Sequence, residues 1–338
     1  MPFDIIGLGL ATLDILIRLG ELPTWEHGAG CSAVGLDGGG PVGTACVAAA
    51  RLGARVGFVG TAGNDQLAAL KVQSLREDGV DLSRLAMRDV PENQVVVVYV
   101  NQNSGERVFS GLHCFGSEPL QVDELDRAYI TSAHFLHLDG THPEAALQAA
   151  QWMRAAGKKV SLDCAKSDGK SIWGELRELV PYADILICGS GFGRALTGHA
   201  DLWRAGEAML TLGPQIVVQT EGKDGSYTLT AEERFHTPAF DVTVVDTTGA
   251  GDVFHGAYLV GLQHNWDLRR VALFATAVSA IKCTHLGGRT GVPTFEQTLA
   301  FLHQRGYSME ESCSESITTF EHSQGENNHA IDFNRPDT

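Results

Sequence analysis

Short apolar segments typical of β-strands alternate with helix-like segments through most of the 338-residue chain. Strands are predicted near residues 4–10, 56–61, 133–138, 160–164, 185–188, 216–219 and 226–230. Helices are predicted near residues 42–52, 66–78, 143–156, 174–180, 202–211, 268–284 and 295–304. This alternation is typical of a parallel sheet that is covered by helices on both faces. The sequence therefore predicts an α/β fold of three layers around a central, mostly parallel sheet.

Two segments depart from the alternation. A valine-rich run at residues 95–100 is followed by a turn at 101–105 and a second extended run from 106, which is the pattern of a β-hairpin. Residues 13–19 also look extended where a helix would be expected. We predict that segments around 13–35 and 91–113 together form a small β-sheet lid inserted into the α/β body.

Charge and hydropathy exclude several classes of protein. The net charge is −16 and no basic stripe is present, which argues against nucleic acid as a partner. No apolar run approaches 18 residues, so no membrane span is predicted. Residues 1–7 enter a strand directly, without the basic start of a signal peptide, and a cytoplasmic location is expected. The folded domain is predicted over 1–305, and the acidic, polar segment 306–338 is predicted to be a disordered tail.

Cysteine and histidine are interpreted as structural residues. The 7 cysteines are scattered, odd in number and without a C-x-x-C pair, which favours reduced thiols in a cytoplasmic enzyme. None of the 13 histidines occurs in an H-x-x-x-H pattern with an acidic partner. His134 and His137, which flank a strand-like run, are therefore expected to be core or surface imidazoles and not metal ligands.

The strongest chemical motif is Asp-Thr-Thr-Gly-Ala-Gly-Asp-Val-Phe at residues 246–254. A β-rich run at 240–245 leads into a glycine turn, and a small-residue helix is predicted over 252–262. A helix N-terminus offers unpaired amide groups and about half a positive charge, which together attract anions. Asp252 stands where a carboxylate could take a proton from a hydroxyl beside such an anion site. A base next to an anion site is suited to phosphoryl transfer onto an alcohol.

This motif resembles the second signature of the ribokinase-like (PfkB) carbohydrate kinases, D-T-T-G-A-G-D-x-F, at every fixed position. The resemblance covers about residues 4–304 and implies a ribokinase-like three-layer sandwich with a β-sheet lid over the sugar. It also implies an ATP-dependent kinase that phosphorylates a hydroxymethyl group of a sugar or related polyol. By this resemblance Asp252 is the catalytic base, and the backbone of Gly249, Ala250 and Gly251 forms the anion hole.

The resemblance also implies where the sugar binds. Gly38-Gly39-Gly40-Pro-Val-Gly-Thr44 is similar to the first signature of the family, although Thr44 stands where the family has Asn. Threonine keeps one hydroxyl but lacks the two amide donors and the carbonyl. The candidate sugar-binding residues are Asp14, which follows the first strand, Gly39, Gly40 and Thr44 of this block, and Arg107 of the lid. Arg107 could equally be a solvated surface residue.

The nucleotide is expected at the C-terminal half. The segment Thr220-Glu-Gly-Lys-Asp-Gly225 is similar to the family turn that borders the ATP phosphates, and residues 275–293 match the stretch that lines the adenine pocket. Candidate nucleotide-binding residues are Thr220, Gly222, Gly225 and Ala277. ATP and Mg²⁺ are the implied cofactors. Asp246 and Thr248 are further implied to hold a monovalent cation such as K⁺.

Two departures leave alternatives open. The family usually carries N-x-x-E, which organises Mg²⁺, but Gly189 and Phe192 stand at those positions. Of the D-x-N-x-R strand element only Asp163 is kept. A nucleoside kinase of the same fold and a catalytically weak sugar- or nucleotide-binding pseudo-kinase therefore remain alternatives. With no cluster of Arg or Lys near the lid or the glycine block, a neutral sugar is favoured. Dimerisation through the valine-rich lid is predicted.

Overall fold

The computed structural model describes residues 2–309 except residues 166 and 173. Within this part of the chain the central sheet has eight strands in the order β14-β13-β12-β11-β10-β9-β1-β4. The pairs from β12 through to β4 are parallel, and β13 and β14 are antiparallel to their neighbours. The strands are β1 (Ile5–Leu8), β4 (Val56–Val59), β9 (Phe135–Leu138), β10 (Lys159–Cys164), β11 (Ile185–Gly189), β12 (Ile216–Thr220), β13 (Ser226–Leu229) and β14 (Arg234–Thr237).

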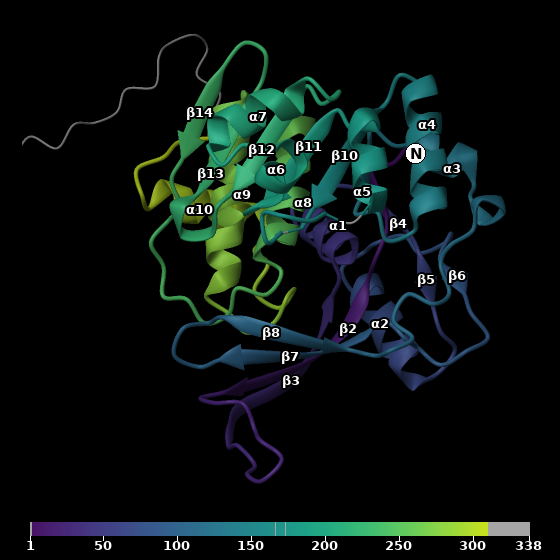
Figure 1. The fold of residues 1–338 in the computed structure, drawn as a ribbon, viewed down its shortest axis with the longest axis vertical. Helices are drawn as coiled ribbons and strands as arrows, with labels where there is room; N and C mark the ends of the chain where they lie inside the picture. The colour runs from purple at the N-terminus through teal and green to yellow at the C-terminus, as the bar shows by residue number, and fades with distance from the viewer. Residues whose placement is uncertain (1, 166, 173, 310–338) are drawn as a thin grey trace, which may run out of the picture.

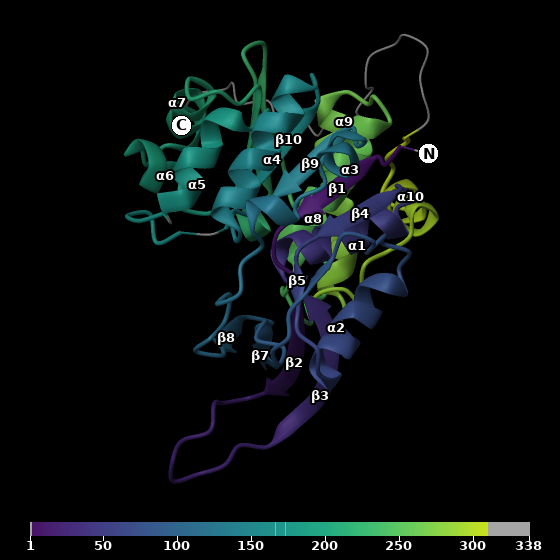
Figure 2. The ribbon, with the colours of Figure 1, turned by 90° about the vertical axis from the view of Figure 1, so that its right-hand side faces the viewer.

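Helices cover both faces of this sheet, as Figure 2 shows. One face packs against α1 (Pro41–Arg51), α8 (Ala250–Gln263), α9 (Leu268–Cys283) and α10 (Phe295–His303). The other face packs against α3 (Arg127–Thr131), α4 (Pro143–Ala155), α5 (Gly174–Leu179), α6 (Phe192–Thr197) and α7 (Leu202–Leu210). Alternate residues of each strand feed the two cores, because successive side chains of a strand point to opposite faces. The prediction of a three-layer α/β fold is confirmed.

The lid is a separate four-stranded sheet in the order β3-β2-β7-β8. It is formed by β2 (Thr12–Leu19), β3 (Cys31–Gly39), β7 (Val95–Asn101) and β8 (Arg107–Gly111). In Figure 1 this sheet extends below the body, and α2 (Gln66–Arg76) lies beside it. The short strands β5 (Thr61–Ala62) and β6 (Ala86–Met87) pair with each other. The predicted hairpin at 95–110 and the extended segment at 13–19 are confirmed as parts of this lid.

Some local predictions were wrong. Residues 240–245, expected as a strand, are not part of any β-ladder among the described residues. Val245 N donates a 2.8 Å hydrogen bond to Cys283 O. Helix α8 starts two residues earlier than expected, at Ala250. The tail predicted at 306–338 falls mostly on residues 310–338, which lie outside the described residues.

Candidate active site

The start of α8 is shaped for an anion. Gly249 is the residue before the helix and has φ 72°, in the left-handed region that favours glycine. A Cβ on Gly249 would stand 2.8 Å from the backbone oxygen of Gly288. Ala250 N makes a long bond of 3.3 Å to Thr247 O, and Gly251 is exposed. The first amides of a helix have no intrahelical acceptor, so this end of α8 presents donors to a ligand.

Asp252 lies in the first turn of α8, among other charged side chains. Burial raises the pKa of its carboxyl group above the ordinary range, and the nearby charge of Asp139 adds to this. Arg107, Lys282 and Arg289 act in the opposite direction. A carboxylate with a raised pKa is a better proton acceptor than a fully solvated one. The location therefore suits general-base chemistry.

Asp14 projects from β2 at the base of the lid, next to the end of β3. Its Oδ1 accepts a 2.6 Å hydrogen bond from Thr12 Oγ1. Burial raises the pKa of Asp14 to about 6, against the opposing effects of Thr12 and Arg289. A Cβ on Gly39 would overlap the Asp14 carboxylate. Glycine is therefore required at position 39, because the Asp14 carboxylate lies directly against its backbone. Asp14 and Gly39, both predicted from the sequence, lie side by side.

Thr44 and Gly40 differ in what they offer a ligand. Gly40 has φ 83° and precedes α1. Thr44 is fully buried, and its Oγ1 lies 3.4 Å from Nε of Arg289. Arg289 also donates to Gly39 O and, at 2.9 Å, to Ser74 Oγ. The hydroxyl of Thr44, expected to face the sugar, thus contacts a buried arginine that sequence reasoning missed.

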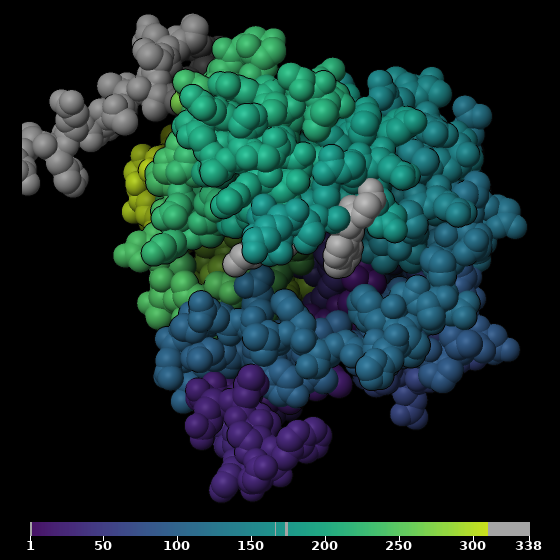
Figure 3. Space-filling model, viewed as in Figure 1, coloured from purple at the N-terminus to yellow at the C-terminus, as the bar shows by residue number. Residues whose placement is uncertain are grey.

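Arg107 connects the lid to the anion-binding turn. Its Nη1 donates a 2.8 Å hydrogen bond to Thr247 Oγ1, across 140 positions of sequence. Thr247 in turn contacts the lid backbone, donating from Oγ1 to Gly105 O at 3.1 Å. Figure 3 shows a hollow between the lid and the body on the face viewed there, with N-terminal residues visible at its bottom. The hydrogen bond to Thr247 places the Arg107 guanidinium next to the motif at residues 246–254.

Asp246 is completely buried and its oxygens have protein partners. Oδ1 accepts from the amide and hydroxyl of Thr248, both at 2.7 Å, and Oδ2 accepts from Gly287 N at 2.8 Å. The backbone oxygen of Asp246 accepts a 2.9 Å hydrogen bond from Nζ of Lys282, which is itself fully buried. An ammonium group is therefore held where a monovalent cation was predicted, and this donor set does not fit a resident K⁺.

The predicted nucleotide-binding residues do not all lie at one surface. Thr220 ends β12 and donates from Oγ1 to Cys188 O at 3.3 Å, and Gly222 begins the short 3₁₀ turn η3 (Gly222–Asp224). Gly225 follows with φ 88°, and a Cβ there would overlap Thr237 O. Ala277, by contrast, is fully buried in the core of α9. The turn fits a phosphate-bordering role, whereas the side chain of Ala277 faces protein.

The two positions of the missing N-x-x-E motif lie at the carboxyl end of β11. Gly189 is the last residue of the strand, and Phe192 is 1% exposed within the core. Gly189 pairs in register with Thr220, the last residue of β12, and Glu221 directly follows Thr220. Carboxylates are the protein ligands that Mg²⁺ prefers. Glu221 is thus an acidic residue at the same edge of the sheet as Gly189.

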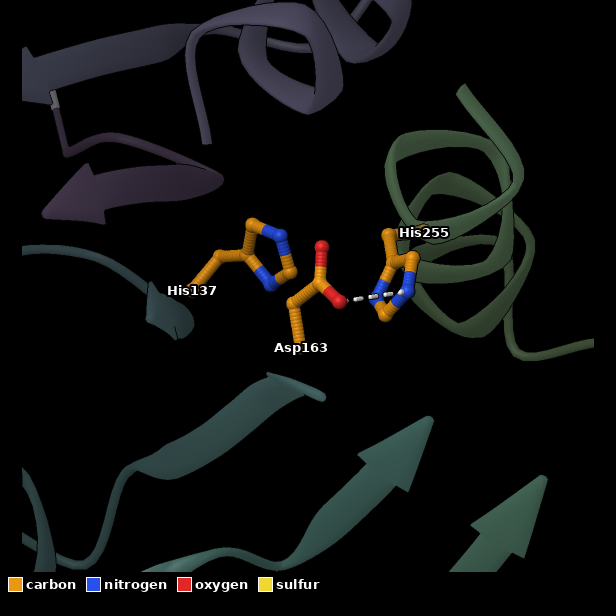
Figure 4. Close-up of side chains that lie close together, drawn as sticks. All are labelled: His137, Asp163 and His255. Atoms are coloured by element: carbon orange, nitrogen blue, oxygen red, sulfur yellow. Dashed lines mark ion pairs between the residues drawn. The ribbon is translucent and has the colours of Figure 1, made fainter. Parts of the chain in front are cut away.

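The side chains of His137, Asp163 and His255 form a cluster, and His255 belongs to α8 (Figure 4). Nε2 of His255 is 3.4 Å from Oδ1 of Asp163, and all three side chains are less than a tenth exposed. His137 was expected to be a core or surface imidazole, and it lies in the core. The sequence pattern did not predict that Asp163 and His255 lie beside it. The available signal was that His137 and Asp163 lie in neighbouring strands and His255 lies three residues after Asp252.

The family of this chain follows from its sequence. The model of the pfkB family carbohydrate kinases matches residues 10–295. The chain belongs to the PfkB family and is a carbohydrate kinase. An aminoimidazole riboside kinase from Salmonella typhimurium is 31% identical over 274 residues, which cover 76% of this chain and 85% of the relative. An ATP-dependent ribose-1-phosphate kinase from Halopiger xanaduensis is 28% identical over 302 residues, which cover 89% and 98%.

Solved structures show the same ribokinase-like fold. Arabidopsis thaliana ribokinase, complexed with ribose and ATP, has a TM-score of 0.75 and 23% identity, covering 89% of this chain and 99% of that chain. An E. coli protein named ribokinase II, in complex with ATP and Mg²⁺, has a TM-score of 0.77 and 22% identity, with coverage of 89% and 99%. Within residues 2–309, apart from 166 and 173, no helix has the length and apolarity needed to cross a membrane.

Proposed function

We propose that this chain transfers the γ-phosphoryl group of ATP to a hydroxymethyl group of a sugar or related polyol, with Asp252 as the general base. Asp252 takes the proton of the hydroxymethyl oxygen as that oxygen attacks phosphorus and the bond to the β-phosphate oxygen breaks, which releases ADP. The amides of Gly249, Ala250 and Gly251 stabilise the negative charge on the transferring group.

The observation that carries this proposal is the position of Asp252 beside the open amides of α8. The carboxyl group of Asp252 has a raised pKa, and the charge of Asp252 contributes to raising the pKa of Asp14. We propose that Asp14, the sugar-binding candidate, and Asp252, the base, belong to one site. Arg107 reaches the same site from the lid. Lid closure would exclude water from the transfer.

ATP and Mg²⁺ are the proposed cofactors. The turn from Thr220 to Gly225 would border the phosphates, and Glu221 would hold Mg²⁺ together with the phosphates of ATP and water. When bound, Mg²⁺ neutralises charge on the phosphates during transfer. The register pair of Gly189 with Thr220, the residue before Glu221, supports this assignment, because Gly189 stands at the first position of the missing motif.

We further propose that Lys282 takes the place of the monovalent cation. Its ammonium group contacts the backbone of Asp246, directly before the anion-binding turn. Burial lowers the pKa of Lys282, and the charge of Asp246 opposes this change in favour of the charged form. A tethered positive charge can order this turn without K⁺.

A neutral sugar remains the proposed substrate class. Arg289 is the buried cation nearest to the glycine block, and its donors are engaged by Gly39, Thr44 and Ser74. Such an arginine shapes the pocket and leaves Asp14 to accept hydrogen bonds from neighbouring hydroxyls. A nucleoside kinase is the second candidate, favoured by the 31% identity to the aminoimidazole riboside kinase.

A homodimer through the lid is proposed from the outward face of its sheet. The register of β3, β2, β7 and β8 puts seven apolar side chains in two adjacent rows on one face: Val34, Ile17, Tyr99 and Val108, and Leu36, Ile15 and Val97. Val34 is 69% exposed and Leu36 is 57% exposed. An apolar patch of this kind is typical of a protein interface, and a second lid is its proposed partner. The domain is proposed to end near residue 305.

An ADP-release assay over neutral sugars, sugar acids, phosphosugars and nucleosides tests the function. We expect turnover with a neutral sugar and ATP. Turnover limited to nucleosides would support the second candidate. Binding heat in calorimetry without ADP release for any member of the panel would contradict the proposal and indicate a pseudo-kinase. Sedimentation at micromolar concentration tests the lid dimer, which a monomer would contradict.

A further inference from the structure

The cluster of His137, Asp163 and His255 joins three separate elements of the fold. His137 lies in β9, Asp163 in β10 and His255 in α8. His137 pairs in register with Ser161, and Asp163 is two residues further along β10, so all three of these side chains lie on the same face of the sheet. That face is the one covered by α8, and Figure 4 shows Asp163 between the two imidazole rings.

The three side chains of the cluster are almost completely buried. His137 is 0% exposed, His255 4% and Asp163 6%. Nε2 of His137 and Nδ1 of His255 are buried and have no hydrogen-bond partner among the described residues. Nδ1 of His137 lies 3.3 Å from Ser161 Oγ. Buried polar atoms are almost always paired, so the unpaired Nε2 of His137 at this depth needs an explanation.

We propose that His137, Asp163 and His255 bind a divalent transition-metal ion of the Zn²⁺ type, at a site separate from that of the Mg²⁺ that accompanies ATP. One ring nitrogen of each histidine and one carboxylate oxygen of Asp163 all lie within 4.8 Å of one another. Two ligands on a tetrahedral zinc, with bonds of about 2.0–2.1 Å, are about 3.3 Å apart. The 3.4 Å between His255 Nε2 and Asp163 Oδ1 meets this spacing.

The ligand types favour a transition metal over Mg²⁺. Imidazole nitrogen suits Zn²⁺ and its neighbours in the first row, whereas Mg²⁺ takes oxygen ligands. Metal binding requires the neutral form of each imidazole ring and the ionised form of the carboxyl group.

The negative charges around the cluster also favour a divalent cation. Asp139 and Asp252 act electrostatically on Asp163, so three acids share this part of the interior. A divalent cation bound by one carboxylate and two neutral histidines leaves one net positive charge, which offsets part of the charge of the other two acids. The ion would connect α8, which carries the anion-binding turn at its start, to β9 and β10. The site is thus structural for the catalytic end of the helix.

Metal content and metal-dependent unfolding test the proposal. The full-length protein is purified, its zinc is measured by mass spectrometry, and a chelator-treated sample is reloaded with Zn²⁺ or Co²⁺ in excess Mg²⁺. We expect about one equivalent of Zn²⁺ per chain, visible d–d absorption with Co²⁺, and a higher Tm after reloading. A wild-type protein that contains no transition metal, and whose Tm and absorption do not respond to either ion, would overturn the proposal.

Variants give a second readout. His137→Gln and Asp163→Asn should lose the bound ion and the rise in Tm. His142→Gln is the matched control, because His142 is also buried with an unpartnered Nε2 among the described residues, yet it contacts Leu120 N and not the cluster. Metal retained by His137→Gln at the wild-type level would contradict the assignment. If the variants do not fold, the comparison of chelated and reloaded wild type decides alone.

Discussion

The ammonium group of Lys282 lies 2.9 Å from the backbone oxygen of Asp246, and both residues are completely buried. A lysine is rarely buried unless it is paired. Here its charge lies at the residue that begins the anion-binding motif, 36 positions away in sequence. The contact relates the end of α9 directly to the start of α8.

From this contact we predict that the kinase does not need K⁺. Initial rates in potassium chloride and in choline chloride should agree, because Lys282 already supplies the positive charge. Lys282→Ala should lower kcat strongly, and K⁺ should restore part of the loss because the shorter side chain leaves room for an ion. Strong activation of the wild-type enzyme by K⁺ would rule the idea out.

Asp252→Asn is predicted to lower kcat by about 10²–10⁴-fold, the usual contribution of a general base. The amide keeps the size of the side chain but cannot take the proton, so KM should change little. Steady-state kinetics with the best sugar of the panel measures both constants. Turnover close to that of the wild type would refute the assigned role.

Gly39→Ala is predicted to lower kcat/KM for the sugar by about 100-fold, as misplacement near a substrate can. The added Cβ would overlap the Asp14 carboxylate and displace it. Gly35→Ala on the same strand is the control, because its Cβ would meet only the Leu16 side chain, at 3.9 Å. Equal kinetics of the two variants would show that Asp14 does not need this approach. Thermal unfolding of both variants checks that the lid remains folded.

Sugar binding is predicted to weaken as the pH falls below about 6. Burial, with smaller contributions from Asp37 and Asp252, raises the pKa of Asp14 from 3.8 to about 6. Protonation removes acceptor capacity for sugar hydroxyls, so kcat/KM should decline on the acidic side with this pKa. In Asp14→Asn this acidic step should be absent from a lower profile. An unchanged step in that variant would assign it to another group.

The same shift has a consequence for folding stability, with the opposite trend in pH. The folded protein binds the Asp14 proton more tightly than the unfolded chain does. This contribution is therefore fully present below pH 3.8 and is lost as the pH rises towards about 6. Denaturant unfolding of wild type and Asp14→Asn across this window measures it, and parallel curves would contradict the shift.

Arg107→Ala is predicted to lower kcat/KM by about 10–100-fold, which corresponds to the loss of a hydrogen bond from a charged donor. The arginine reaches Thr247 in the anion-binding motif from the lid. Arg18→Ala is the control, since Arg18 is a lid arginine that donates to Gln102 O at 2.9 Å instead. Similar kinetics for both variants would argue that Arg107 only covers the surface.

Much of the fold is local in its causes, and the sequence therefore predicted it. The alternation of apolar strands and small-residue helices indicated the covered parallel sheet, and the valine-rich run at 95–100 indicated the lid. Asp252 and Gly249 could be located because a glycine turn and a helix start are made by neighbouring residues. Residues 240–245 show the limit, since β-propensity does not supply a pairing partner.

The tertiary structure decided the partners that come from distant parts of the chain. Arg289 contacts Gly39 and Thr44, which are 250 and 245 positions away in the sequence. Lys282 meets Asp246, and His137, Asp163 and His255 meet only because β9, β10 and α8 pack together. No local pattern marks such contacts, because packing and charge pairing act through space, and the sequence alone does not state which faces will meet.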